Sequence, residues 1–351
     1  MQFIKSNVNI DFIGKRKAAF YLSLAMIVVS IVSLVANKGP RYGIDFSGGS
    51  EVKVGFSEPM EAKVLRSTLK EIGVANATIQ EEMGGELGAV KGTRYLIRTD
   101  QAEEGAKEFF AKIKTDLQNA TGSTVEIRAF DMVGPQVGQD LQEQALMAMF
   151  FALLFITIYI SGRFELKWML SGVMAGALAG AVYALSIFNV SIPFLIVAAL
   201  LVALVLFWVL ELKYAMGAIV ALIHDVTITV GIFSIFDKEF TLPIIAALLT
   251  IIGYSLNDTI IVFDRIRENL RKHHRLSLAR TINRSINETL SRTLLTSLTT
   301  LAVVLALFTL GGGIIHDFAF ALIVGVLIGT YSSVFVASPI LLSWQGKSKT
   351  A

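Results

Sequence analysis

Asp258 is the residue of this 351-residue chain whose position most directly suggests chemistry. It lies inside a hydrophobic run, in the segment GYSLNDTIIVFDRIREN at 253–269, which becomes strongly charged only after Phe263. An ionised Asp near the middle of a membrane helix costs about 2.5–3.5 kcal/mol on insertion scales. Chains that keep such a carboxylate generally use it in an ion path or pair it with a cation. Asp258 therefore predicts a proton-coupled membrane machine.

Arg292 is the predicted partner of Asp258. It opens the next apolar run at the same depth, and Thr296, Ser297 and Thr299 make that helix polar. A nearby cation would stabilise the ionised form of Asp258, and movement of the helices would separate the cation from the carboxylate. Two alternatives stay open: Asp258 as a structural carboxylate hydrogen-bonded to Ser or Thr, and Arg292 as an anchor at the membrane interface.

His224 and Asp225 lie near the middle of another apolar run, at 214–236. Adjacent residues of a helix point about 100° apart, so we do not expect these two side chains to form one dyad. Asp225 is predicted to be a proton relay or a pairing group, and His224 a packed polar residue.

The elements that carry these residues are predicted from the composition and from the apolar runs. The chain is 54% hydrophobic and 17% charged, which is typical of a membrane protein. It has no cysteine, which excludes disulfides, thiolate catalysis and Cys-based metal sites. No catalytic group, cofactor, metal or nucleic acid is expected. The apolar runs are 18–36, 145–162, 168–210, 214–236, 240–263, 293–315 and 318–346.

The run at 168–210 is too long for one span. A single helix of this length would measure about 65 Å, twice a hydrocarbon core of about 30 Å, and the segment NVSIP at 189–193 supplies a break. The sequence therefore predicts a polytopic α-helical membrane protein with about eight transmembrane helices. In this division, 214–263 and 293–346 each contribute two spans.

Charge placement orients these spans, because Lys and Arg accumulate in short loops on the cytoplasmic side. Segment 1–17, the basic loop at 264–292 and the tail at 347–351 are therefore predicted to be cytoplasmic, with both termini inside. Segment 37–144 is predicted to be outside; it has 13 Lys+Arg and 17 Asp+Glu, which leaves 18 and 11 for the rest. The alternative that 18–36 is a cleaved signal peptide is disfavoured by its length and by the segment NKGP that follows it.

The outer segment is predicted to be a compact α+β domain. Alternating residues predict strands at 51–56, 77–82, 95–99 and 124–130, and helices at 60–72 and 102–120. The resulting order, β-α-β-β-α-β, is the split βαβ or ferredoxin-like arrangement, with a glycine-rich turn at 84–88 between the middle strands. Its charges are spread as on a solvated surface, so no catalytic site is expected in it.

Five ordered motifs resemble those of the SecD/SecF family of protein-export membrane proteins, which is part of the RND superfamily. They are RYGIDFSGGS at 41–50, DMVGPQVG at 131–138, ALIHDV at 221–226, the segment at 253–269, and ETLSRTLLTS at 288–297. The residues that match the family motifs, beside Asp225, Asp258 and Arg292, are Gly43, Asp45, Phe46, Gly48, Gly49, Gly134, Pro135, Asn257, Asp264, Arg265, Arg267, Glu268 and Asn269.

The resemblance implies a membrane subunit of the Sec machinery in the bacterial inner membrane. Such a subunit is expected to work with SecD beside the SecYEG channel, and to use the proton-motive force to pull preproteins outward after SecA-driven insertion. Membrane lipids are the other expected partners. Asp258, Arg292 and Asp225 are then expected to couple proton flow to movement of the outer domain.

One departure from the family is visible. SecF members resemble a six-span design, whereas here ELKW at 165–168 recurs as ELKY at 211–214 with two apolar spans between. The segment 168–210 is therefore interpreted as an inserted transmembrane hairpin. An even number of added spans leaves the orientation of the following helices unchanged.

Two other functions are weighed against export of proteins. An RND-type proton-coupled exporter of small molecules or lipids would share this architecture, but its outer domain would be expected to be larger than the single small one here. An intramembrane aspartyl protease would need two facing carboxylates, and its Gly-x-Gly-Asp element is absent around Asp225 and Asp258.

Overall fold

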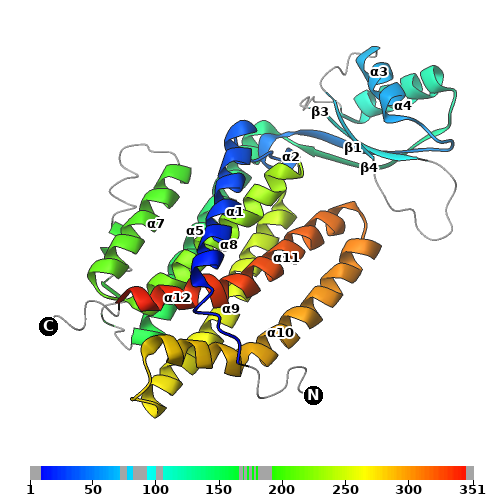
Figure 1. Cartoon of the computed structure of the whole chain (residues 1–351). Coiled ribbons are helices and arrows are strands. Elements are labelled where there is room, and N and C mark those ends of the chain that lie inside the picture. The colour runs from blue at the N-terminus through cyan, green and yellow to red at the C-terminus, as the bar shows by residue number, and fades with distance from the viewer. Residues whose placement is uncertain are drawn as a thin grey trace.

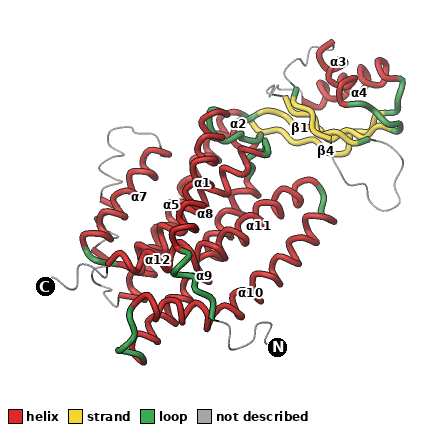
Figure 2. Tube along the Cα trace, in the orientation of Figure 1, coloured by secondary structure: helices red, strands yellow, loops and turns green. Residues whose placement is uncertain are grey.

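The computed structural model describes residues 9–71, 77–81, 93–99, 106–165 and 192–344, with isolated positions between 169 and 180. Figure 1 shows a bundle of long helices with a small α/β domain beyond one end of it. The start of α1 and the short helix α12 lie at the opposite end of the bundle from this domain (Figure 1). In Figure 2 the strands are confined to the small domain.

Six helices in the described residues are long and apolar enough to cross a membrane. They are α1 (Arg16–Ala36), α5 (Pro135–Glu165), α8 (Lys213–Ile235), α9 (Leu242–Lys272), α10 (Leu278–Leu310) and α11 (Gly313–Ser332). The last continues through a π-helical turn, η1 (Ser333–Ala337), into α12 (Ser338–Ile340) and a 3₁₀ turn, η2 (Leu341–Trp344). The prediction of a polytopic helical membrane protein is confirmed.

The predicted count of eight helices is not reached in the part of the chain that the structure describes. The second half of the 168–210 run forms α7 (Ile192–Val209), an apolar helix of 18 residues. It packs against α5 and α8, and its Phe207 is fully buried. Most of the first half lies outside the described residues, so the inserted hairpin stays a prediction.

Three helices extend well past the apolar runs that predicted them. α5 begins at Pro135 rather than at residue 145. The segment 264–292 is mostly helical, because α9 continues to Lys272 and α10 begins at Leu278, and its predicted place as a cytoplasmic connection stays a prediction. Ion pairs one turn apart, Lys272 to Glu268 at 2.5 Å and Arg284 to Glu288 at 2.8 Å, support the charged ends of these helices.

The small domain contains four strands and two helices in the predicted order. They are β1 (Gly49–Phe56), α3 (Ala62–Glu71), β2 (Thr78–Glu81), β3 (Arg94–Thr99), α4 (Ala106–Thr121) and β4 (Val125–Val133). The sheet is antiparallel with the strand order β2-β3-β1-β4. The predicted turn at 84–88 lies outside the described residues.

The core of this domain follows from the alternation of side chains along its strands. Val52, Val54 and Phe56 of β1 are buried, and they pack with Tyr95 and Ile97 of β3. Alternate residues of a strand face one side of the sheet, and this side is covered by Leu65 and Leu69 of α3 and by Leu117 of α4. The two helices therefore close the apolar core on one face of the sheet.

Candidate functional site

Asp225 is the centre of a polar cluster buried between four membrane helices. Its side chain is fully buried on α8. Its Oδ2 accepts hydrogen bonds from Ser255 of α9 at 2.5 Å and from Ser332 of α11 at 2.7 Å. Its Oδ1 lies 2.8 Å from Nδ1 of His224. Buried polar groups need hydrogen-bond partners, and both oxygen atoms of this carboxylate have them.

The cluster continues from His224 to α1 and back to α11. His224 Nε2 lies 3.1 Å from Ser23 Oγ, which lies 3.1 Å from the Tyr331 hydroxyl. The Tyr331 hydroxyl donates to the carbonyl oxygen of Ala19 at 2.8 Å. The rings of His224 and Tyr331 are stacked, with centroids 6.1 Å apart.

Counting donors along this chain places a proton between Asp225 and His224. Tyr331 uses its one proton on Ala19, so it accepts from Ser23, and Ser23 in turn accepts from His224 Nε2. The contact between His224 Nδ1 and Asp225 then needs one more proton, on either the ring or the carboxyl. The two side chains therefore share a proton.

The prediction that His224 and Asp225 would not form a dyad is wrong. Their Cα–Cβ bonds do diverge on the helix, but the imidazole ring reaches back to the neighbouring carboxylate. The contact is set by packing from α1 and α11, through Ser23 and Tyr331, which helix geometry alone does not reveal.

Glycine on α11 allows the approach that brings Ser255 and Ser332 to Asp225. A Cβ at Gly329 would lie 2.9 Å from the Cβ of Ser255, and one at Gly325 would lie 2.3 Å from Ile251 Cγ1. Two glycines one turn apart therefore let the backbones of α11 and α9 approach closely, as small residues do in membrane bundles.

Asp258 lies one turn beyond Ser255 on α9, in a different environment. Its side chain is 1% exposed, yet neither carboxylate oxygen has a hydrogen-bond partner among the described residues. The hydroxyl groups nearest in sequence are used elsewhere: Ser255 donates to Asp225, and Thr259 donates to the carbonyl of Ser255 at 3.2 Å. The alternative of a structural carboxylate held by Ser or Thr is therefore not observed.

Arg292 does not form the predicted ion pair with Asp258 in this structure. Its side chain is exposed on α10, while the next residue, Thr293, is buried with an unpartnered hydroxyl. The reason for the difference is the rotation of α10, which turns Thr293 inward and Arg292 outward.

The glycine-rich motif at 43–49 joins the small domain to the bundle. Gly43 precedes the short helix α2 (Ile44–Ser47), and its N–H donates to Phe240 at 2.8 Å. Asp45 Oδ2 accepts from the N–H of Leu242 at 2.9 Å and so caps the first turn of α9. Phe46 is buried near Phe240 at the same end of the bundle.

The motif at 131–138 packs directly on this glycine-rich motif. Gly48 has a φ of 73° and Gly49 a φ of 119°, backbone conformations that favour glycine. A Cβ at Gly48 would lie 2.8 Å from the Cα of Pro135, and one at Gly138 would lie 2.9 Å from the backbone nitrogen of Gly48. Gly134 directly precedes α5, and Pro135 is its first residue. The two motifs form one junction.

A group of ion pairs also ties the sheet to the loop between α8 and α9. Arg98 of β3 contacts Glu51 at 2.5 Å and also pairs with Glu239. Arg41 contacts Glu239 at 3.3 Å and Asp237 at 2.6 Å. The start of α9, which carries Asp258, is thus held to the domain by charges as well as by the Asp45 cap.

The charged end of α9 is stabilised by contacts with α5 and α10. Asn269 is buried and donates to Ser285 at 3.0 Å and to Glu288 at 2.7 Å. Arg265 pairs with Glu288 and Glu268, both at 2.7 Å. Of the other motif residues, Asp264 pairs with Arg163 of α5 at 2.8 Å, Arg267 donates to the Arg163 carbonyl at 3.2 Å, and Asn257 is exposed.

Sequence reasoning missed four members of this cluster: Ser255 and Ser332, which donate to Asp225, and Ser23 and Tyr331, which are linked to it through His224. Each is a polar residue within an apolar run, which is the signal that could have selected them. Serine in a membrane helix is common, however, and only the structure shows which serines meet at the same carboxylate.

These features define a multi-pass helical membrane protein with carboxylates buried between its helices and a small α/β domain fixed at one end. The chain matches two family descriptions: "Protein export membrane protein SecD/SecF, C-terminal", over residues 112–204 and 179–347, and "SecD/SecF GG Motif", over residues 33–60. The chain belongs to the SecD/SecF family of protein export membrane proteins.

Individual relatives are similar over almost the whole chain. The protein translocase subunit SecF of Magnetococcus marinus is 41% identical over 344 residues, which cover 97% of this chain and 94% of that protein. The SecF of Desulfurispirillum indicum is 38% identical over 339 residues, 96% of this chain and 92% of that protein.

A solved structure shares the fold. The crystal structure of SecDF, a translocon-associated membrane protein from Thermus thermophilus, is 30% identical, with a TM-score of 0.69 over 98% of this chain. A second SecDF structure, in a super-membrane-facing form, is 31% identical with a TM-score of 0.56. This chain spans 40% of the length of each SecDF chain.

Proposed function

We propose that this chain is a SecF-like subunit of the Sec protein-export machinery. It acts with SecD and uses the proton-motive force to drive the late stages of preprotein translocation through SecYEG, after SecA-driven insertion. The similarity to SecF proteins and to SecDF structures supports this assignment. The proposal includes a location in the bacterial inner membrane, with both termini in the cytoplasm and a ferredoxin-like domain outside.

The observation that carries the mechanism is the contrast between two buried carboxylates, Asp225 on α8 and Asp258 on α9. Asp225 is fully hydrogen-bonded and shares a proton with His224, whereas Asp258 is buried without a partner. A partnerless carboxylate is stable in the membrane as the neutral acid, and it becomes stable as the anion only when a cation approaches. Asp258 is therefore the proton-binding group, and Arg292 is the cation that approaches it when α10 rotates.

Movement at Asp258 reaches the outer domain through α9. The helix runs without a break from Leu242 to Lys272, so its first turn and Asp258 move together. That first turn is capped by Asp45. Glu239, which precedes it in the chain, forms an ion pair with Arg98 of the sheet. A proton-dependent shift of α9 is thereby transmitted to the domain that meets the emerging preprotein.

The test is gradient-dependent export in inverted membrane vesicles that contain Asp258→Asn in place of the native protein. The variant should assemble with SecD and retain SecA-driven insertion, but lose the stimulation of export by the proton gradient. Asp140→Asn is the matched control, because Asp140 is an exposed carboxylate on α5, and it should keep full stimulation. Normal gradient-dependent export by Asp258→Asn would exclude this residue as the coupling site and move the assignment to Asp225.

The same vesicles separate this function from small-molecule or lipid export. A SecF-like subunit should co-purify with SecD and SecYEG and should change preprotein transport. An RND-type exporter would instead show proton-coupled transport of its own substrate without any effect on preproteins.

A further inference from the structure

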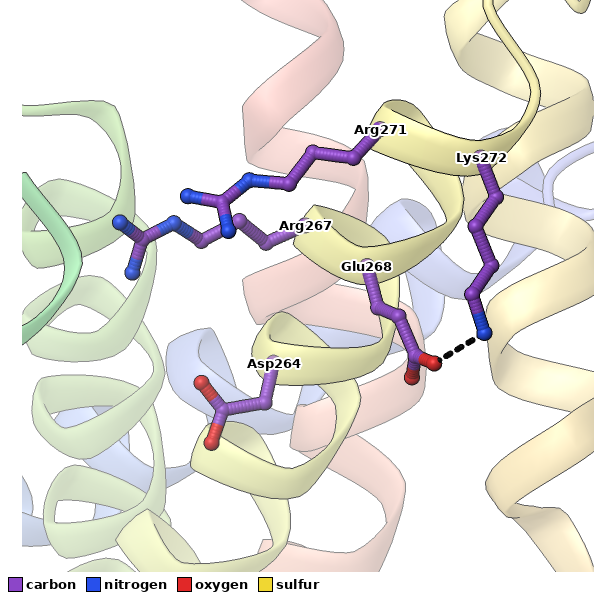
Figure 3. Close-up of a pocket in the computed structure, with 5 residues that line it drawn as sticks. All are labelled: Asp264, Arg267, Glu268, Arg271 and Lys272. Carbon is purple, nitrogen blue, oxygen red and sulfur yellow. Dashed lines mark hydrogen bonds and ion pairs between the residues drawn. The ribbon is translucent and has the colours of Figure 1, made fainter.

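Arg267 and Arg271 lie one turn apart at the charged end of α9 and line a surface pocket together with Asp264, Glu268 and Lys272. Figure 3 shows their guanidinium groups next to each other on one side of the helix, while Glu268 and Lys272 point to the other side. The pocket therefore presents two parallel cationic groups in the same direction.

The carboxylates of this pocket are already paired with other cations. Asp264 accepts from Arg163 of α5 at 2.8 Å. Glu268 accepts from Arg265 at 2.7 Å and from Lys272 at 2.5 Å. Both carboxylates are therefore neutralised by cations other than the two parallel arginines.

Among the residues that the structure describes, the two arginines have no anionic partner. Arg267 donates to a carbonyl oxygen, that of Arg163, at 3.2 Å, and Arg271 makes no hydrogen bond or ion pair with the residues that the structure describes. Like charges one helical turn apart destabilise a helix. An anion placed between the two guanidinium groups would remove this repulsion.

The geometry of guanidinium selects the kind of anion. Its planar fork of N–H donors matches the oxygen atoms of phosphate and binds them in pairs. Two such forks facing one point can hold a phosphate monoester or diester through several charge-assisted hydrogen bonds.

The depth of the pair matches the lipid headgroup layer. The apolar stretch of α9 ends at Phe263, so Arg267 and Arg271 begin about 6 and 12 Å farther along the helix axis. Side chains of a helix lean toward its N-terminus, here back toward the apolar stretch. The polar layer on each side of a bilayer is about 5–8 Å thick, so Arg267 is expected within it, and Arg271, which begins beyond it, is expected to reach it through this backward lean.

We propose that Arg267 and Arg271 form a binding site for the phosphate headgroup of an anionic phospholipid. The site lies where α9 meets α5 and is separate from the buried carboxylates. A bound headgroup would fix the end of the helix whose middle carries Asp258.

The test is lipid retention by the purified full chain, measured by native mass spectrometry with phosphatidylglycerol or phosphatidylcholine as probe. The native protein should retain phosphatidylglycerol in preference to phosphatidylcholine. Loss of the charge-assisted hydrogen bonds of one guanidinium group should lower retention about fivefold in Arg271→Gln, and about twenty-five-fold in the double variant with Arg267→Gln. Arg271→Lys keeps the charge and should lose less.

Controls separate a defined site from general charge. Arg275→Gln with Arg280→Gln removes two exposed cations outside the pocket, and it should leave retention unchanged. Equal loss in this control, or no loss in the pocket variants at an unchanged melting temperature, overturns the proposal. Inorganic phosphate is added as a competitor: tight phosphate binding that depends on Arg271, without any retention of phosphatidylglycerol, also overturns the assignment to a lipid.

Discussion

The hydroxyl group of Ser255 donates a hydrogen bond to Oδ2 of Asp225 across the interface between α8 and α9, at 2.5 Å. Ser255 lies a single turn from Asp258, but its one hydroxyl proton is used in the bond to Asp225 and is not donated to Asp258. Two carboxylates in the same bundle are therefore held in opposite ways, one by three polar side chains and the other by none of those described.

This difference predicts unequal effects on stability when each carboxylate is removed. Asp225→Ala leaves the hydroxyls of Ser255 and Ser332 and the ring of His224 without their acceptor, and each orphaned group costs about 1–3 kcal/mol. Asp258→Ala orphans no described partner and should change the free energy of unfolding by less than about 1 kcal/mol. Thermal unfolding in detergent measures both variants, and equal losses would show that Asp258 is also a structural group.

Glycine packing between α9 and α11 predicts a second stability effect. In Gly329→Ala the new Cβ would lie 2.9 Å from the Cβ of Ser255, so the helices must separate at a cost of about 1–3 kcal/mol. Gly253→Ala is the matched control, because no atom lies within 4 Å of its Cβ position, and alanine there should stabilise α9 by up to about 1 kcal/mol. If both variants melt at the same temperature, the close approach of the helices is not needed.

The order of elements in the small domain was predictable because its strands alternate between apolar and polar residues. The pairing of His224 with Asp225 was not, because Ser23, Tyr331 and Ser332 come from segments far away in the sequence. The apolar runs also predict the depths of Asp258 and Arg292, which stay predictions. Their lateral positions were not predictable, because the rotation of α10 decides whether Arg292 or Thr293 faces inward, and packing sets that rotation.

Orientation in the membrane is predicted from the distribution of Lys and Arg and can be tested with single cysteines, since the chain has none of its own. Cysteine replacing Glu126 of β4 should react with an impermeant maleimide from outside, and cysteine replacing Lys272 should react only after permeabilisation. Cysteine replacing Asn189 should behave like the Glu126 variant, because residues 168–210 are predicted to cross the membrane twice. Reaction of Asn189 together with Lys272 would refute the spanning hairpin.

Arg292 is expected to act as a charge that approaches Asp258 during the cycle, because it is exposed in this structure and makes no ion pair with that residue. Arg292→Ala removes the cation, so Asp258 should stay protonated, and gradient-dependent export should fall to the level of Asp258→Asn while assembly with SecD persists. Arg292→Lys keeps a cation and should restore part of the export. The matched control is Arg280→Ala, which removes an exposed cation from the same helix farther from the apolar run and should export normally. An interfacial anchor would behave differently: Arg292→Ala would then lower the amount of protein in the membrane, and export per inserted molecule would stay unchanged.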